Sequence, residues 1–223
     1  MIEKILVAGG TGRTGQIIVR DLIANGYHPH LLVRDLDKAT ALFGEDVTLH
    51  QGDVRDFETL LEPLSGMDVL ISAIGSCTPV GKNCPKRVDY EGVANLVRAA
   101  QINRVGHFIL ISSIAVTHPE HPLNRFGKIL DWKRKGEETL QHSGLNYTII
   151  RPGGLKDTPR GGCALVFSQG DQALGTLSRE DLAQICLQVL HGPAPSQVTF
   201  EAIEACQNQT SDWSELFASL VPD

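Results

Sequence analysis

The chain has 223 residues, 42% of them hydrophobic and 21% charged, a length that suits one α/β domain with a sizeable core and is short for two. The formal net charge is -6 and the longest basic run is Lys133-Arg134-Lys135, which argues against nucleic acid or an anionic membrane as the main partner. No apolar run approaches the ~20 residues of a membrane span, and no charged and apolar leader precedes the first expected strand. We therefore expect a cytoplasmic protein without membrane insertion.

The cysteines form an odd set without Cys-x-x-Cys spacing. They are Cys77, Cys84, Cys163, Cys186 and Cys206. Neither a disulfide framework nor a zinc site is indicated by this spacing. We expect reduced, mostly buried thiols and no bound metal.

A glycine-dense turn follows the first expected strand, the apolar run Ile5 to Ala8. Apolar residues then recur at helical spacing until Asn25-Gly26, so the pattern is strand, turn, helix. The spacing Gly10-x-Gly12-x-x-Gly15 allows a tight turn that brings backbone N–H groups to a pyrophosphate at the helix N-terminus. The alternative is a glycine-rich turn that binds nothing. We predict a phosphate-binding turn formed by Gly9, Gly10, Thr11, Gly12, Arg13, Thr14 and Gly15.

The end of the second expected strand, His30 to Arg34, distinguishes between two cofactors. An acidic residue there binds the ribose of NAD, whereas an arginine accommodates the 2′-phosphate of NADP. Arg34, together with Arg13 and Lys38, predicts NADP(H), because three cations suit a phosphate dianion better than a neutral ribose edge. Asp35 supports the competing NAD interpretation, and three solvated surface cations are the remaining alternative.

The next two expected strands end in further candidate cofactor residues. Asp53 and Val54 follow the third strand and could contact the adenine, although Asp53 could instead be the N-cap of a following helix. The fourth strand ends in Ala73-Ile74-Gly75, which would run beside the cofactor's sugars. Residues 76–87 are rich in Gly, Pro and Cys and predict a loop on the substrate side of the same sheet edge.

Two more expected strands end in polar or glycine-rich segments. The fifth ends in Ser112-Ser113, before a loop at 114–124, and the sixth is broken by Pro152-Gly153-Gly154. Residues 153–177 then show no clear periodicity, which is typical of a functional lid on the substrate side. A capping pattern at Ser178-Arg-Glu-Asp181 opens the following helix.

Strands and helices alternate along the whole chain. The expected strands are residues 5–8, 30–34, 47–51, 69–75, 107–113, 145–151 and 197–203. The first expected helix follows the glycine turn and ends at residue 25, and the later ones cover residues 37–43, 57–64, 88–103, 132–140, 178 to about 193, and 212–220. Nearly continuous apolar strands in this order predict a doubly wound parallel sheet, a Rossmann fold, in a single NADP-binding domain over residues 1–223.

These motifs together resemble the atypical short-chain dehydrogenase/reductase superfamily over essentially the whole chain. The glycine turn, the Val33-Arg34-Asp35 strand end, Ser113 and Ser143-Gly-Leu-Asn-Tyr are similar to biliverdin reductase B, or flavin reductase. Two other segments resemble NADP-binding proteins of photosynthetic lineages, among them the dinucleotide-binding half of a chloroplast protein-import component. These segments are Trp132-Lys-Arg-Lys-Gly-Glu-Glu and Tyr147-Thr-Ile-Ile-Arg-Pro-Gly-Gly. The resemblance implies NADP(H) binding on a Rossmann fold.

One departure from the superfamily bears on the reaction. Its usual active site combines a serine with Tyr-x-x-x-Lys, in which the lysine helps the tyrosine to protonate a nascent alkoxide. Lys135 could be that lysine, but Asp131 stands four residues before it. None of Tyr27, Tyr90 and Tyr147 has a lysine four residues later. Interconversion of simple alcohols and ketones is therefore not expected.

A conjugated acceptor needs no such acid, because the charge left by a hydride spreads over the acceptor and water can supply the proton. We predict an NADPH-dependent reductase of a small planar acceptor, a flavin (FMN or FAD) or a bilin-like molecule. Ser113 would orient it, or would only cap the strand end and contact the nicotinamide. His118 and His121 are conceivable proton donors or solvated bystanders. The predicted catalytic residues are Ser113 and Lys135, of which Lys135 would hold ribose hydroxyls rather than transfer a proton. Ser112, Lys135, Pro152 and Gly153 are predicted to bind the nicotinamide end of the cofactor.

The alternative function is a non-catalytic one. An NADP-binding module of this fold could sense redox state or dock onto an unidentified protein partner. The missing tyrosine removes one chemistry without proving another, so both functions remain open at the level of sequence.

Overall fold

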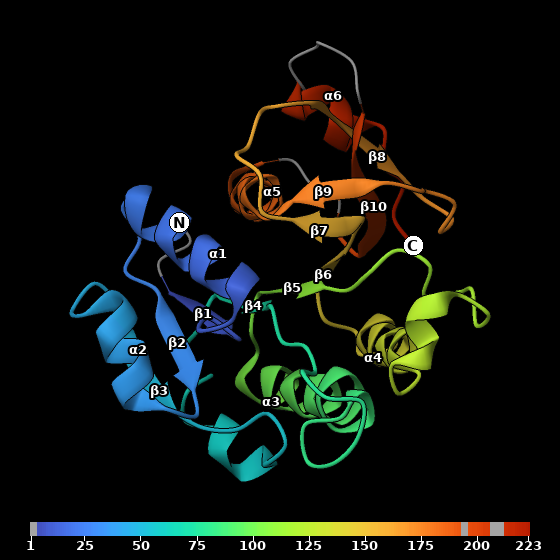
Figure 1. Cartoon of the computed structure of the whole chain (residues 1–223). Helices are drawn as coiled ribbons and strands as arrows, with labels where there is room; N and C mark the ends of the chain where they lie inside the picture. Colours follow the sequence, from blue (N-terminus) through green and yellow to red (C-terminus); the bar gives the residue numbers. More distant parts are fainter. Residues whose placement is uncertain (1–3, 193–195, 206–211) are drawn as a thin grey trace.

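The computed structural model describes residues 4–192, 196–205 and 212–223 (Figure 1). Its main sheet has eight strands in the order β3-β2-β1-β4-β5-β6-β10-β8. Neighbouring strands are parallel except β10 and β8, which are antiparallel. The strands are β1 (Ile5–Ala8), β2 (His30–Val33), β3 (Thr48–Gln51), β4 (Val69–Ser72), β5 (His107–Ile111), β6 (Tyr147–Pro152), β8 (Ala164–Ser168) and β10 (Val198–Ala205).

Helices cover both faces of the main sheet (Figure 1). Along β1, Ile5 and Val7 pack into the core on the side of α1 and α5, whereas Leu6 and Ala8 pack into the core on the side of α3 and α4. This two-sided burial explains why the strands are continuously apolar. The predicted doubly wound sheet of a single α/β domain is confirmed. The helices are α1 (Arg13–Ala24), α2 (Leu36–Phe43), α3 (Val93–Asn103), α4 (Ile129–Gln141), α5 (Arg179–His191) and α6 (Trp213–Ala218).

Side-chain caps fix the start of α2 and α5. The Asp35 carboxylate accepts a hydrogen bond from the backbone N–H of Lys38 at 2.9 Å and so caps α2. The Ser178 hydroxyl accepts from the backbone N–H of Asp181 at 2.9 Å and caps α5, as its sequence pattern predicts. Such contacts satisfy backbone donors that a helix leaves unpaired at its first turn.

The prediction of a long loop at 153–177 is wrong. Gly154–Lys156 forms β7 and pairs in parallel with β9 (Thr176–Ser178), while β8 adds an antiparallel edge to the main sheet. Within β8, Leu165 and Phe167 are buried and Val166 is 39% exposed. This alternation spans too few residues to be distinctive, and its partner β10 lies far along the chain. What remains irregular are the segments 157–163 and 169–175.

Three other expected elements also differ. The helix expected at 57–64 is a short 3-10 helix at Phe57–Leu60, and the helix expected at 88–103 begins as a π-helix at Lys86–Gly92 that continues into α3. The helix expected to reach Pro193 ends at His191, and Pro193 lies outside the described residues. A Cβ atom at Gly136 of α4 would stand 2.7 Å from the Asp89 carbonyl oxygen, so α4 packs closely on the π-helix.

The cysteines are less buried than expected. Cys186 is buried and Cys84 and Cys163 are half-buried, whereas Cys77 on loop 76–87 is exposed. Cys206 lies outside the described residues. The expectation of mostly buried thiols is therefore wrong.

Candidate functional site

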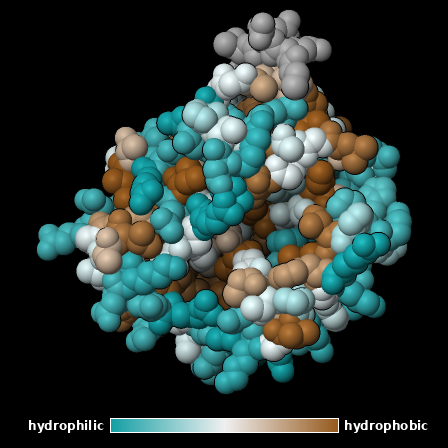
Figure 2. All heavy atoms as spheres, in the orientation of Figure 1, coloured by the Kyte–Doolittle hydropathy of each residue, from teal (hydrophilic) through white to brown (hydrophobic). Residues whose placement is uncertain are grey.

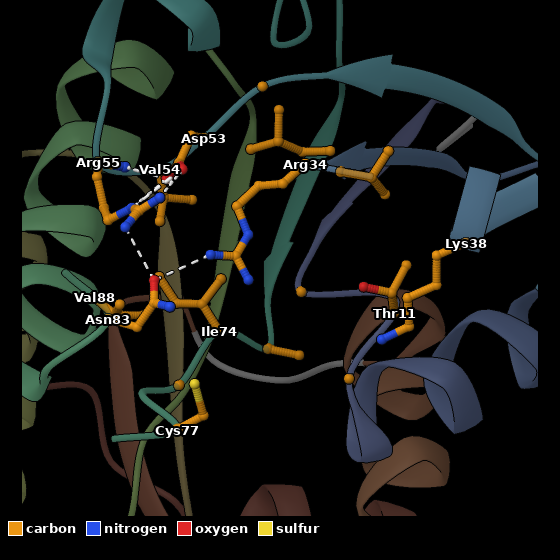
Figure 3. A pocket seen from close by; sticks show the side chains of 17 residues that line it. Thr11, Arg34, Lys38, Asp53, Val54, Arg55, Ile74, Cys77, Asn83 and Val88 are labelled. Atoms are coloured by element: carbon orange, nitrogen blue, oxygen red, sulfur yellow. Dashed lines mark hydrogen bonds and ion pairs between the residues drawn. The ribbon is translucent and has the colours of Figure 1, made fainter. Parts of the chain in front are cut away.

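A pocket of about 320 Å³ opens at the carboxyl ends of β1, β2 and β4 (Figure 3). Doubly wound sheets bind their ligands at this edge. In Figure 2, the same face of the molecule has a hollow near its centre, with hydrophobic side chains inside and hydrophilic ones around it. The lining residues are Gly9, Thr11, Gly12, Leu32, Val33, Arg34, Lys38, Gly52, Asp53, Val54, Arg55, Ala73, Ile74, Gly75, Cys77, Asn83 and Val88.

Many of the predicted cofactor residues meet in this pocket, although they come from four separate segments of the chain. Those brought together are Gly9, Thr11, Gly12, Arg34, Lys38, Asp53, Val54, Ala73, Ile74 and Gly75. The others predicted with them do not line it. These are Gly10, Arg13, Thr14, Gly15, Ser112, Lys135, Pro152 and Gly153.

The glycines of the β1–α1 turn serve different purposes. Gly9 has a φ of +87°, and a Cβ atom there would stand 2.6 Å from the Ala73 carbonyl oxygen. A Cβ atom at Gly15 would stand 2.1 Å from the Gly9 carbonyl oxygen, so this glycine lets α1 pack on the turn. Gly12 has a φ of -82°, and its Cβ would meet the Gly9 carbonyl oxygen at 3.3 Å. Folding therefore requires a glycine at position 12 less strictly than at Gly9 or Gly15. Gly12 lines the pocket at the N-terminus of α1.

One end of the pocket is basic. Arg34 and Arg55 both donate to the Asn83 side-chain oxygen, at 3.1 and 3.0 Å (Figure 3). Arg55 also donates through Nε to the Asp53 carboxylate at 2.9 Å. This hydrogen bond is the main reason why the pKa of Asp53 lies below its usual value, although burial opposes it. The contact of Arg34 is with a neutral amide, so its charge remains available to an anion.

The three cations predicted for a 2′-phosphate do not all converge. Arg34 and Lys38 line the pocket, whereas the Arg13 guanidinium pairs with Asp157, whose other carboxylate oxygen accepts from Arg179 at 2.7 Å. A further cation, Arg55, lines the pocket without having been predicted, and its guanidinium is paired with the Asp53 carboxylate. Its only signal was its place two residues after Asp53 in the loop that follows β3.

The two acidic residues near the pocket, Asp35 and Asp53, make different local contacts. Asp35 caps α2 through the backbone N–H of Lys38 and does not line the pocket. Asp53 is not a helix N-cap. Its carboxylate accepts from the backbone N–H and the side chain of Arg55, and the 3-10 helix begins later, at Phe57.

A second, small cavity of about 10 Å³ adjoins the pocket at Ile74, which lines both. Lys133 and Asp89 form a buried ion pair there, with 3.0 Å between Nζ and Oδ1. The other Asp89 oxygen accepts from the backbone N–H of Ser76 at 3.1 Å. The Ser112 hydroxyl is buried in the same cavity, beside the Glu137 carboxylate. The cavity holds no more than about one water molecule.

The lysine that faces this cavity is Lys133, not Lys135. Lys135 is exposed, and its Nζ lies 4.7 Å from the centre of the Trp132 ring. Two residues along a helix turn the side chain to nearly the opposite face. The available signal was the i, i+4 spacing of Lys133 and Glu137, both of which point inward. The residue four before Lys133 is Ile129, so Tyr-x-x-x-Lys is absent in this register too.

The remaining predicted residues lie beyond β5 and β6. Ser113 is half-buried and directly follows Ser112, whose N–H donates to the Ile150 carbonyl oxygen at 2.8 Å. The Pro152 carbonyl oxygen accepts from the N–H of Ile114 at 3.1 Å. A Cβ atom at Gly153 would stand 2.7 Å from the Gly175 carbonyl oxygen, so Gly153 is required by packing.

The two histidines of loop 114–124 make local contacts. His118 Nε2 lies 3.0 Å from the Asp171 carbonyl oxygen. His121 Nδ1 accepts from the N–H of Leu123 at 3.3 Å and caps a 3-10 helix at Pro122–Arg125. Neither histidine lines the two cavities described above.

Comparison with known proteins places the chain in a family. Residues 9–193 match the model of a family described as NAD(P)H-binding. The chain belongs to this NAD(P)H-binding family. The predicted resemblance to the atypical short-chain dehydrogenases/reductases is thereby confirmed, and binding of a nicotinamide dinucleotide follows from the family.

Known proteins and solved structures are similar to the chain over nearly its full length. An uncharacterized chloroplastic protein of Arabidopsis thaliana is 33% identical over 98% of this chain and 82% of its own. Sanguinarine reductase of Eschscholzia californica is 29% identical, covering 97% and 95%. The structure of ChuY, an anaerobilin reductase from Escherichia coli O157:H7, shares the fold with a TM-score of 0.79, at 24% identity over 93% and 100%.

Within 4–192, 196–205 and 212–223, no cluster of three or more His, Cys, Asp or Glu side chains is arranged to bind a metal ion. In the same part of the chain, every helix is too short or too polar to cross a membrane.

Proposed function

We propose that the chain is an NADPH-dependent reductase that transfers hydride to a flavin or a bilin-like conjugated acceptor. The observation that carries this proposal is a continuous arrangement along the sheet edge. The pocket lined by Arg34 and Lys38 leads past Ile74 to the buried Ser112 hydroxyl, and no tyrosine among the described residues lines either cavity. A 2′-phosphate at one end would place the nicotinamide toward the other.

The residues present fit NADP(H). Gly12 at the N-terminus of α1 leaves room for a pyrophosphate that a side chain would fill, and the helix end favours an anion. Arg34 and Lys38 would hold the 2′-phosphate, whereas the charge of Arg55 is already paired with Asp53. The cofactor would supply a hydride from its nicotinamide ring. Further contacts to adenine and sugars would come from Asp53, Val54, Ala73, Ile74 and Gly75.

On the nicotinamide side, we assign Lys133 the role that the sequence suggested for Lys135. It would hold ribose hydroxyls rather than transfer a proton, since Asp89 already compensates its charge. Ser113 would orient the acceptor, and Gly154, exposed on β7, would leave room for a flat ring. Positioning two reactants in this way can supply ~7–11 kcal/mol in favourable cases. The name of the Eschscholzia relative, sanguinarine reductase, supports a reductase.

One observation favours the second candidate, a non-catalytic NADP(H)-binding module. The enclosed space beyond Ile74 is only about 10 Å³, so an acceptor would have to bind on the open face rather than in a closed pocket. Such a module would sense redox state or dock onto a protein partner. A cytoplasmic location remains a prediction, and the Arabidopsis relative is named as chloroplastic.

The test is NADPH oxidation, followed at 340 nm, with FMN, FAD, a bilin and a quinone as acceptors. The proposal predicts turnover above the buffer rate with at least one of them and none with simple ketones. Gly12→Val serves as the control, since it removes cofactor binding and should abolish the signal. NADPH binding without oxidation of NADPH by any acceptor would support the binding module instead.

A further inference from the structure

Asp171 is a buried carboxylate that sequence patterns gave no reason to single out. It lies in segment 169–175 between β8 and β9, is 2% exposed and has a φ of +59°. The left-handed conformation is uncommon for a residue other than glycine, and Asp and Asn are among the few that adopt it without large cost. Such positions persist when surrounding contacts fix them.

The contacts of Asp171 reach the loop that follows Ser113. One carboxylate oxygen accepts from the backbone N–H of Ala115 at 2.7 Å. The other accepts from the N–H and the hydroxyl of Thr117, at 2.7 and 2.8 Å. Ala115 itself has a φ of +65°. Two residues in uncommon backbone conformations, 56 positions apart, are thus held by one set of hydrogen bonds, here named the Asp171 bridge.

The Asp171 bridge is anchored to buried residues of the main sheet. The N–H of Asp171 donates to Glu201 of β10 at 2.9 Å, and Glu201 is fully buried. Arg151 lies 3.9 Å from Glu201 and makes a two-pronged contact with the buried Glu137 of α4. Burial alone would raise the pKa of Asp171, but the hydrogen bonds from Thr117 and Ala115, with Arg151 nearby, hold it below its usual value.

The strand end at Ser112-Ser113 is held from two directions. On one side, β6 accepts hydrogen bonds from the N–H groups of Ser112 and Ile114, at 2.8 and 3.1 Å. On the other side, the Asp171 bridge fixes residues 115–117. Ser113 therefore lies between two anchored points. Breaking the second anchor would release residues 115–117 and leave the Ser113 segment held by β6 alone, while the dinucleotide pocket stays intact, because Asp171 does not line that pocket.

We propose that Asp171 is a positioning residue, which fixes Ser113 for the acceptor by clamping residues 115–117 onto segment 169–175. This inference rests on the proposed reductase function. The bridge acts on the acceptor side alone, so its loss should slow turnover and spare NADPH affinity. A residue that only stabilised the fold would affect both.

The test compares Asp171→Asn with the wild type. Asparagine keeps the size and tolerates the φ of +59°, but an amide N–H₂ would oppose the Thr117 donors. We expect amide hydrogen exchange at Ala115 and Thr117 to accelerate at least tenfold, kcat with the best acceptor to fall at least tenfold, and the Kd for NADPH to stay within twofold. Thr117→Val should show a smaller effect of the same kind, and Thr117→Ser should retain wild-type behaviour.

The matched control is Gln172→Ala, which changes an exposed side chain in the same segment. It should leave exchange at Ala115 and Thr117, kcat and Kd unchanged. Unchanged exchange in Asp171→Asn, or an equal loss of NADPH affinity and kcat, would overturn the proposal. A wild type without turnover on any acceptor would overturn the reductase function, and with it the positioning role of Asp171. Faster exchange in Asp171→Asn would then show only that the hydrogen bonds of the Asp171 bridge exist.

Discussion

Arg34 is the residue on which the choice of cofactor depends most. Its guanidinium lies in the pocket with the neutral Asn83 amide as hydrogen-bond partner. A charge-assisted contact to a phosphate typically contributes ~1.5–3 kcal/mol. Arg34→Ala should therefore weaken NADPH by roughly ten- to a hundredfold and leave NADH nearly unchanged, as measured by calorimetry. Arg20→Ala, on the exposed face of α1, is the control. Equal wild-type affinities for the two cofactors would contradict the assignment.

Gly12 and Gly15 should respond differently to a side chain. Gly12→Val meets one backbone oxygen at 3.3 Å and otherwise projects into the pocket, so the protein should fold, with an unchanged circular dichroism spectrum, and lose NADPH binding. Gly15→Val would place its Cβ 2.1 Å from the Gly9 carbonyl oxygen and should destabilise the fold itself. Retained NADPH affinity in Gly12→Val would mean that the pyrophosphate binds elsewhere.

Ser113 should matter for the reaction rather than for cofactor affinity. A hydroxyl that orients the reacting ring acts mainly in the transition state. Ser113→Ala should then lower the single-turnover rate of hydride transfer while the Kd for NADPH changes little. If NADPH affinity falls and the rate does not, Ser113 contacts the nicotinamide alone.

At the scale of elements, the junction of β6 and β7 offers a matched pair of glycines. A Cβ atom at Gly153 would stand 2.7 Å from the Gly175 carbonyl oxygen, whereas at Gly154 the nearest atoms are 3.7 Å away. Gly153→Ala should lower the free energy of unfolding by ~1–3 kcal/mol, and Gly154→Ala should change it by less than ~0.5 kcal/mol. Urea unfolding of both variants measures the difference, and equal losses would contradict the packing described here.

The elements that the sequence predicts well are those with local signals. β1, the glycine turn and α1 follow one another within a few residues, so periodicity and spacing suffice to identify them. β8 could not be found in this way, because it is defined by pairing with the distant β10. The same limit explains why Arg55 was not predicted, because its hydrogen bond in the site is to Asn83, which belongs to another loop. Lys133 could have been preferred to Lys135 from helical spacing alone.

For the whole molecule, His107 couples stability to pH. Burial lowers the pKa of His107 from 6.5 to about 4. The unfolded chain therefore binds a proton more readily, and stability falls as the pH drops from 6.5 toward 4. The loss approaches ~1.4 kcal/mol per pH unit and about 3 kcal/mol in total. His107→Gln should flatten this part of the profile of unfolding free energy against pH. An unchanged slope would show that other groups cause it.

The reaction we propose for the whole domain is delivery of a hydride from NADPH to a conjugated acceptor. The most direct measurement is the single-turnover rate of NADPH oxidation with the best flavin, bilin or quinone, using NADPH with either hydrogen or deuterium at the transferred position. We predict oxidation above the buffer rate and a slower reaction with deuterium, because the bond to the transferred atom breaks in the step observed. Tight NADPH binding without oxidation by any of these acceptors would contradict the account.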